Sequence, residues 1–197
     1  MAETNTVNLE EVRVGAVVCV DRHWAIGRDN RLLYNIKEDM AVFKNASMGH
    51  AVIMGYNTMK SLPGEKPLEG RYNIVLAPKG TKLPKGFKLA TSVESALLIG
   101  KKWEAESGNR VKLVVIMGGA SVYEQMLPYT DAAIVDMVGD IADRPDAFFP
   151  NLESDSNFKC TYRGDPKPTE SGYSLSMLIF ERVQLGASKD NGPQPEA

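Results

Sequence analysis

One carboxylate lies where a buried residue is expected, and this side chain is the best placed for acid–base chemistry. Residues 35–44 have the apolar spacing of an amphipathic helix, with Ile36, Met40 and Phe43 recurring at the helical interval. Asp39 falls between Ile36 and Phe43, on the face that should pack against the protein. Burial of an unpaired carboxylate is costly and raises its pKa toward neutrality, where proton transfer needs it. The spacing leaves two interpretations open: a proton-transfer group, or a buried aspartate bonded to neighbouring backbone.

Strand and helix patterns alternate along the chain and predict an α/β fold. Apolar, β-branched runs predict strands at residues 12–20, 51–54, 72–77, 87–90, 111–117, 132–138, 158–162 and 173–182. Amphipathic runs and capping residues predict helices at residues 35–44, 56–62, 92–105 and 121–127. Such alternation predicts a mostly parallel central β-sheet with helices on both faces. The last two strands can form a hairpin, so the C-terminal strand is expected to be antiparallel.

The loops that follow the predicted strands are the expected ligand site, because open parallel sheets bind ligands beyond the carboxyl ends of their strands. Asp39 should meet three segments there: residues 55–58, 76–79 and 117–121. Gly118 and Gly119 would let the backbone approach a phosphate, and the helix that follows would supply amide donors. Thr58 adds a hydroxyl at a second helix start, and two such termini suit a pyrophosphate. The glycine pair could also serve packing, and the absence of G-x-G-x-x-G disfavours an ordinary Rossmann site.

Composition excludes several classes of function. The chain has 197 residues, 43% of them hydrophobic, which suits one globular domain. Its net charge of −2 gives no sign of a nucleic-acid or membrane partner. With two cysteines and two histidines in all, no metal-ligand cluster is predicted. His23 and His50 lie in turn-like segments and are expected at the surface.

The chain ends differ in character from its centre. Residues 1–11 are polar and acidic, without the features of a signal peptide, and are expected to form a flexible extension. Residues 184–197 are rich in Gly, Pro, Asn and Lys and are expected to be disordered. No apolar run approaches membrane-spanning length. A single domain is therefore expected over residues 12–183, in a cytoplasmic protein.

Six short segments occur in the order in which one enzyme family has them. They are residues 20–27, 35–44, 52–61, 67–74, 117–125 and 146–150. Together they resemble the dihydrofolate reductases over nearly all of residues 12–183. In that family they correspond, in order, to the start of the mobile loop over the active site, the helix with the catalytic acid, the cofactor-binding turn, the loop with the folate-tail arginine, the glycine-pair motif, and a marker before the last hairpin.

The resemblance implies reduction of 7,8-dihydrofolate to 5,6,7,8-tetrahydrofolate by hydride transfer from NADPH. Asp39 would bind the pteridine amino group and ring N–H, and would assist protonation of N5 through an ordered water or a substrate tautomer. Arg71 would clamp the glutamate α-carboxylate, which a planar bidentate donor fits. The implied catalytic positions are Asp39, Tyr34 and Leu32. The implied substrate-binding positions are Asp39, Met40, Phe43, Leu62, Leu68, Arg71, Met117, Tyr123 and Asp136.

A cofactor site is implied as well. Its positions are Val17, Ile26, Gly27, Asn30, Leu32, Gly55, Tyr56, Asn57, Thr58, Ser61, Leu76, Ala77, Pro78, Lys79, Met117, Gly118, Gly119, Ala120, Ser121, Val122 and Tyr123. The family also implies a cis peptide between the paired glycines. Its usual basic and serine contacts to the 2′-phosphate are replaced by Tyr56, Pro78 and Ser121, so NADH is an alternative to NADPH. Lys79, and then Lys60, are the candidates for the missing charge.

Three further departures from the family pattern lie near Asp39. Leu33 and Tyr34 stand in place of Pro-Trp, and the Tyr34 hydroxyl could anchor a water. Val17 replaces a small alanine and would narrow the pteridine pocket. Asp136 stands where a threonine usually supports the catalytic acid. If it faces Asp39 the two carboxyls should titrate as a unit, and otherwise it faces solvent.

Dihydrofolate and antifolate-like small molecules are the expected partners, and the protein is expected to be a monomer. Two other functions stay open. One is another pyridine-nucleotide reductase of the same fold, such as a riboflavin-pathway enzyme acting on a ribosylaminopyrimidine. Asp39, Phe43 and Arg71 argue against it, because that substrate has no p-aminobenzoyl-glutamate tail. The other is a non-catalytic nucleotide-binding protein, which the altered adenosine end would allow.

Overall fold

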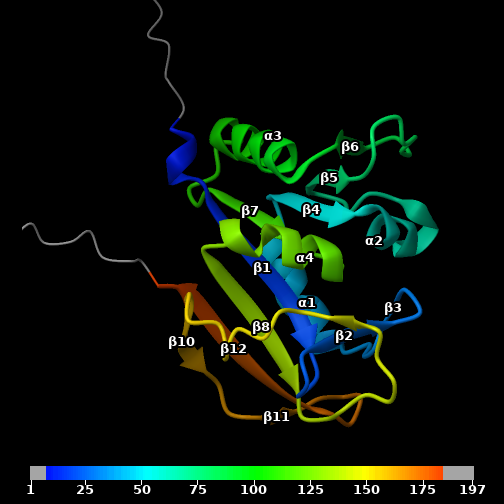
Figure 1. Cartoon of the computed structure of the whole chain (residues 1–197), viewed down its shortest axis with the longest axis vertical. Coiled ribbons are helices and arrows are strands. Elements are labelled where there is room, and N and C mark those ends of the chain that lie inside the picture. Colours follow the sequence, from blue (N-terminus) through cyan, green and yellow to red (C-terminus); the bar gives the residue numbers. More distant parts are fainter. Residues whose placement is uncertain (1–7, 184–197) are drawn as a thin grey trace, which may run out of the picture.

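A nine-stranded, mostly parallel sheet forms the centre of the protein (Figure 1). The computed structural model describes residues 8–183. The strands of this sheet are β1 (Arg13–Val20), β4 (Ala51–Gly55), β5 (Tyr72–Leu76), β6 (Phe87–Ala90), β7 (Leu113–Ile116), β8 (Ala132–Val138), β10 (Phe158–Arg163), β11 (Lys167–Pro168) and β12 (Ser174–Arg182). Their order is β10-β12-β8-β1-β7-β4-β5-β6, with β11 paired to β12. The strands from β8 to β6 run parallel, whereas β12 pairs antiparallel with both β8 and β10.

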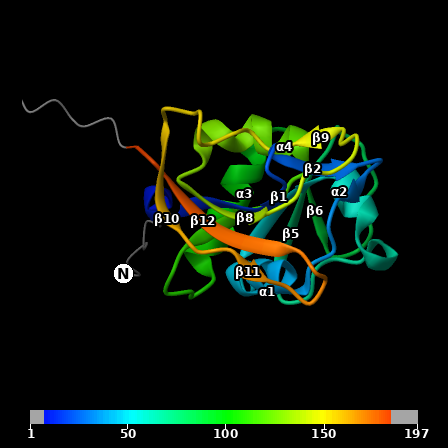
Figure 2. The same ribbon diagram turned by 90° about the horizontal axis from the view of Figure 1, so that it is seen from below.

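Helices cover both faces of this sheet, which confirms the predicted fold class. One face carries α1 (Lys37–Ser47) and α2 (Tyr56–Ser61), whose Phe43 and Met59 belong to one apolar cluster. The other carries α3 (Val93–Glu106) and α4 (Ala120–Met126), whose Leu97 and Met126 belong to another. Figure 2 shows α4 and α1 on opposite sides of the sheet. Because both faces are covered, the central strands are almost wholly apolar, as in β4.

A second, three-stranded sheet was not predicted from the sequence. It consists of β2 (Ala25–Arg28), β3 (Arg31–Leu32) and β9 (Ala147–Phe148), in the order β3-β2-β9. The carboxylate of Asp21, which is fully buried, accepts hydrogen bonds from the backbone N–H groups of His23, Ala25 and Ala142. These bonds fix the segment after β1 against a loop more than a hundred residues away, so the loop that carries Leu32 starts from an anchored base.

Short 3₁₀ helices complete the described part of the chain. They are η1 (Leu9–Glu11), η2 (Pro63–Glu65) and η3 (Leu127–Tyr129). The first of them lies within the segment expected to be a flexible N-terminal extension. Residues 1–7 of that segment, and the expected disordered tail at 184–197, lie outside the described residues. Within residues 8–183, none of the helices has the length and apolar content that crossing a bilayer would require.

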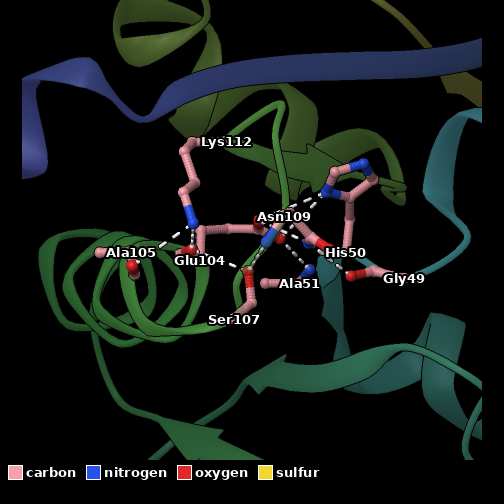
Figure 3. A network of polar contacts seen from close by, with 8 residues as sticks. All are labelled: Gly49, His50, Ala51, Glu104, Ala105, Ser107, Asn109 and Lys112. Carbon is pink, nitrogen blue, oxygen red and sulfur yellow. Dashed lines mark hydrogen bonds and ion pairs between the residues drawn. The ribbon is translucent and has the colours of Figure 1, made fainter.

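The fully buried carboxylate of Glu104 links the C-terminal end of α3 to the start of β4 (Figure 3). Glu104 accepts a hydrogen bond from the backbone N–H of Ala51 at 2.7 Å and another from Nδ2 of Asn109 at 3.2 Å. Nδ1 of His50 lies 3.2 Å from the same carboxylate. The expectation that His50 lies at the surface is therefore wrong, because its imidazole is drawn into the contact with Glu104 and is only 16% exposed.

We expect Glu104→Gln to lower the free energy of unfolding by about 1–3 kcal/mol, because an amide leaves at least one buried donor without its acceptor. Urea denaturation at pH 7 measures the change. Glu106→Gln is the matched control, since Glu106 lies on the exposed side of the same helix end. Equal stability of the two variants would show that the Glu104 contacts contribute nothing net.

Candidate active site

Two buried carboxyl groups face each other between α1 and the sheet. Asp39 lies in the first turn of α1 and is 8% exposed, and Asp136 lies in β8 and is 2% exposed. Their side chains are within hydrogen-bonding reach of each other. Asp136 is the register partner of Cys19 in β1, so the pair sits against the strand that ends at the predicted ligand site. Of the two orientations left open for Asp136, the structure has the inward one.

Burial raises the pKa of both carboxyls. It raises the pKa of Asp39 to about 6, with a hydrogen bond from Asp136 acting in the opposite direction. Burial, and then the negative charge on Asp39, raise the pKa of Asp136 to about 7. A proton shared by the two carboxyls would remove the repulsion between them. Such a pair loses its protons in two coupled steps and still holds one proton close to neutrality.

An apolar wall lies beside this pair. This apolar cluster contains the buried Val17, and its partly buried members include four implied ligand-binding residues from separate segments. Those four are Phe43, Leu62, Leu68 and Met117, so five of the residues implied for ligand binding pack in one place. Met40 lies on α1 with 39% of its surface exposed, next to Asp39 in the sequence. The site can therefore hold a flat, largely apolar ring against a carboxylate.

Arg71 lies at the other end of α1. Its guanidinium donates to the carbonyl oxygen of Glu69 at 2.7 Å, to Oγ of Ser47 at 3.2 Å and to the carbonyl oxygen of Lys44 at 3.4 Å. Asp39 and Lys44 are five residues apart, which is about 7.5 Å along a helix. A ligand with a ring at Asp39 and an acidic tail would reach this cation.

Glycines bring the ends of β4 and β7 together. The N–H of Gly55 donates to the carbonyl oxygen of Gly118 at 2.8 Å. Gly118 has a φ of 95°, and a Cβ there would lie 2.5 Å from the Tyr123 ring. The peptide between Gly118 and Gly119 is cis, as the resemblance implied.

Two helices begin at these strand ends. The N-caps of α2 and α4 are Gly55 and Gly119, and neither helix has a side-chain cap. Their first backbone N–H groups are thus available to an anion, and Thr58 lies next to Gly119. Val122 is buried behind this turn, whereas Ala120 is partly exposed at its surface.

Two tyrosines implied for the site lie in different surroundings. Tyr123 is buried, and its hydroxyl donates to the carbonyl oxygen of Val17 at 2.7 Å, which ties α4 to β1. Tyr34 packs edge-on against Tyr173, with ring centroids 5.0 Å apart. Within residues 8–183 its buried hydroxyl has no hydrogen-bond partner. The carboxylates that raise its pKa, after burial, are Asp140 and Asp21.

The loop implied to cover the ligand is built from the small sheet. Ile26 and Gly27 are buried in β2, and Asn30 lies in the turn that follows. Leu32 projects from β3 with 65% of its surface exposed. An exposed leucine on the β2–β3 hairpin is available to a ligand.

The residues implied to bind the adenosine end of the cofactor are open to solvent. Tyr56, Asn57, Ser61, Pro78, Lys79 and Ser121 are exposed, and Leu76 and Ala77 close the end of β5 beneath them. Lys60 forms an ion pair with Glu65 at 2.6 Å, which leaves it a weaker candidate for a phosphate contact. Lys79 forms no ion pair within the described residues, and it remains the first candidate.

Two residues of the site were missed in the sequence. Ser47 is fully buried and orients Arg71 through its hydroxyl. Cys19 is a free thiol whose pKa is raised by burial and then by the charges of Asp39 and Asp136. Ser47 could have been found, because it lies four residues after Phe43 on the same helix face.

Comparison with known proteins places this geometry in a family. The sequence model of the family described as dihydrofolate reductase matches residues 13–182. The chain belongs to the dihydrofolate reductase family. A dihydrofolate reductase of Neisseria meningitidis serogroup B is 36% identical over 172 residues, covering 87% of this chain and 99% of the relative. One from Haloferax volcanii is 34% identical over 185 residues, covering 93% and 90%.

A solved dihydrofolate reductase shares the fold. It is the enzyme from Enterococcus faecalis complexed with NADP(H) and RAB-propyl, with a TM-score of 0.74 at 22% identity. The alignment covers 88% of this chain and 98% of that one. Family membership and fold thus confirm the family and the fold class that the six segments predicted.

Proposed function

We infer that the protein reduces 7,8-dihydrofolate to 5,6,7,8-tetrahydrofolate with NADPH. The observation that carries this function is the buried Asp39 beside an apolar wall, in a chain of the dihydrofolate reductase family. When bound, NADPH supplies a hydride from C4 of its nicotinamide to C6 of dihydrofolate. The protein must bind and orient the pteridine, exclude water and promote protonation of N5.

We propose that Asp39 performs the central part of this task. Its two carboxylate oxygens match the two adjacent donors of the pteridine, the 2-amino group and the ring N3–H. Phe43, Met40 and Met117 pack on the rings, and Leu62 and Leu68 line the channel toward Arg71. N5 is protonated through an ordered water or a substrate tautomer promoted by Asp39. Burial is the main cause of its raised pKa. The raised pKa allows the site to hold a proton near neutral pH.

The glycine-lined strand ends fit a dinucleotide cofactor. Gly55, Gly118 and Gly119 allow close backbone approach, and the uncapped starts of α2 and α4 offer amide donors to a pyrophosphate. Ile26, Gly27, Asn30, Leu32 and Tyr123 would surround the nicotinamide half. Tyr34 is proposed only to support this loop, because its ring packs against Tyr173 and its pKa responds to Asp140 and Asp21.

A spectrophotometric assay with dihydrofolate and NADPH tests the function. Consumption of both, with formation of tetrahydrofolate, is the expected result. Activity only with a ribosylaminopyrimidine would instead indicate a riboflavin-pathway reductase. Cofactor binding without turnover would indicate a nucleotide-binding protein. The proposal includes a cytoplasmic monomer that binds antifolate-like molecules; light scattering at the chain mass of 21.6 kDa checks the monomer.

Discrimination between NADPH and NADH should be weak, less than about tenfold in kcat/KM, because one exposed lysine contributes about 1 kcal/mol or less. The Lys79→Ala variant should lose affinity for NADP⁺ and keep its affinity for NAD⁺, measured by direct titration as well as by rates. Lys82→Ala is the matched control on the same exposed loop. A strong NADPH preference that survives Lys79→Ala would mean that the phosphate site lies elsewhere. Tyr56→Arg should move the ratio toward NADPH.

A further inference from the structure

Asp136 is a buried carboxyl that has no role in the proposed reduction of dihydrofolate. It is 2% exposed, and within residues 8–183 its Oδ2 accepts no hydrogen bond. Asp39 alone can bind the pteridine donors. An extra carboxyl held against Asp39 in an apolar setting is destabilising when both are ionised. Its position therefore suggests that it works in a partly protonated pair.

Within residues 8–183, no cation is among the groups that shift the pKa of either carboxyl. Asp39 comes from α1 and Cys19 from β1, the register partner of Asp136. From α4, the Tyr123 phenol lies close enough that Asp39 raises its pKa, after burial. On the β12 side the register partner of Asp136 is Met177. Thiol and phenol stay neutral here, so only a proton can offset the second negative charge.

We propose that Asp136 is a positioning residue that retains, with Asp39, one proton which a lone carboxyl would release, and so extends protonation of N5 to higher pH. This inference rests on the proposed reductase function. While the proton is held, the hydrogen bond between the two carboxyls orients Asp39 toward the pteridine.

An O–H bond of the pair breaks, an N5–H bond forms through an ordered water, and the charge of the pair changes from −1 to −2. Solvent returns the proton before the next turnover. Repulsion between two adjacent carboxylates raises the proton affinity of the pair and of N5 beside it. Without Asp136 the site should lose its proton at lower pH.

The Asp136→Asn variant tests this role, because an amide of nearly the same shape still donates to Asp39 but cannot ionise. The rate of hydride transfer in a single turnover is measured from pH 5 to 9. In the wild type the rate should fall with a midpoint near the upper ionisation of the pair. In Asp136→Asn the midpoint should move to lower pH, because the second negative charge that raises the proton affinity of the pair is absent. Asp165→Asn, at an exposed position, is the control.

Carboxyl ¹³C NMR of the ligand-free protein gives a readout that does not depend on activity. Two coupled transitions above pH 5 are expected in the wild type, and one in each of Asp136→Asn and Asp39→Asn. An unchanged or raised midpoint of hydride transfer in Asp136→Asn, or ionisation of Asp136 below pH 5, would overturn the proposal. A wild type that shows the two transitions but forms no tetrahydrofolate would contradict the reductase function instead.

Discussion

Replacing Asp39 with asparagine will lower the rate of hydride transfer to dihydrofolate at pH 7 by about 10²–10⁴-fold, the usual contribution of a positioned acid–base group. Asparagine keeps the size of the side chain, but it replaces one acceptor oxygen with an NH₂ donor. That donor would face the donor groups of the pteridine. The substitution also removes one of the two carboxyls whose raised pKa values keep a proton in the site. Stopped-flow measurement of NADPH oxidation gives the rate, and circular dichroism checks that the fold is intact.

The matched control for this variant is Glu38→Gln. Glu38 lies in the same turn of α1 but accepts a hydrogen bond from the backbone N–H of Glu170, away from the pair. It should keep near-normal hydride transfer. Partial recovery of Asp39→Asn at low pH is expected, because solvent protons can then reach N5 without the carboxylate. Near-normal turnover of a folded Asp39→Asn variant at pH 7 would remove Asp39 from the mechanism.

Arg71→Leu should raise the KM for dihydrofolate about tenfold or more with little change in the rate of hydride transfer. A charge-assisted contact contributes roughly 1.5–3 kcal/mol, and its loss far from the reacting atoms weakens ground and transition states alike. Arg71 is oriented by Ser47 and by two backbone carbonyls, so the charge is held in place before the ligand arrives. Steady-state kinetics at fixed NADPH measures the effect.

A substrate without the glutamate tail makes this test specific. The KM for a tail-less dihydropterin should be the same in the wild type and in Arg71→Leu, because the clamp then has no partner. Arg110→Leu, at an exposed position, controls for loss of a positive charge. Equal KM values for dihydrofolate in the wild type and Arg71→Leu would mean that the tail binds elsewhere or that folate is not the substrate.

Much of the architecture could be predicted from the sequence because the local signals agree with one another. The strand patterns, together with capping at Ser92, predicted the central sheet and α3, and Ser92 does accept a hydrogen bond from the Ser95 N–H. Asp39 was found because a charge at an apolar position of a helix is visible in a 3.6-residue period. The predicted helix began two residues early, since Ile36 is extended and α1 begins at Lys37.

Other features depend on contacts between distant segments. The β2–β9 pairing joins Ala25 to Phe148, and strands of two to four residues carry too little periodicity to be recognised. The orientation of Asp136 could not be decided, because β8 is covered on both faces and alternation along it carries no information. Glu104 was detectable in principle, since Ala96, Gly100 and Glu104 lie four residues apart on one buried face of α3.

A single turnover with dihydrofolate and NADPH that carries deuterium at the transferable position of C4 distinguishes direct hydride transfer from other routes. Direct hydride transfer predicts tetrahydrofolate with one deuterium at C6 and none at N5, because the N5 proton comes from solvent through the Asp39 site. Mass spectrometry and proton NMR of the product locate the label. Tetrahydrofolate without deuterium at C6, or no tetrahydrofolate from the folded wild-type protein, would contradict the account.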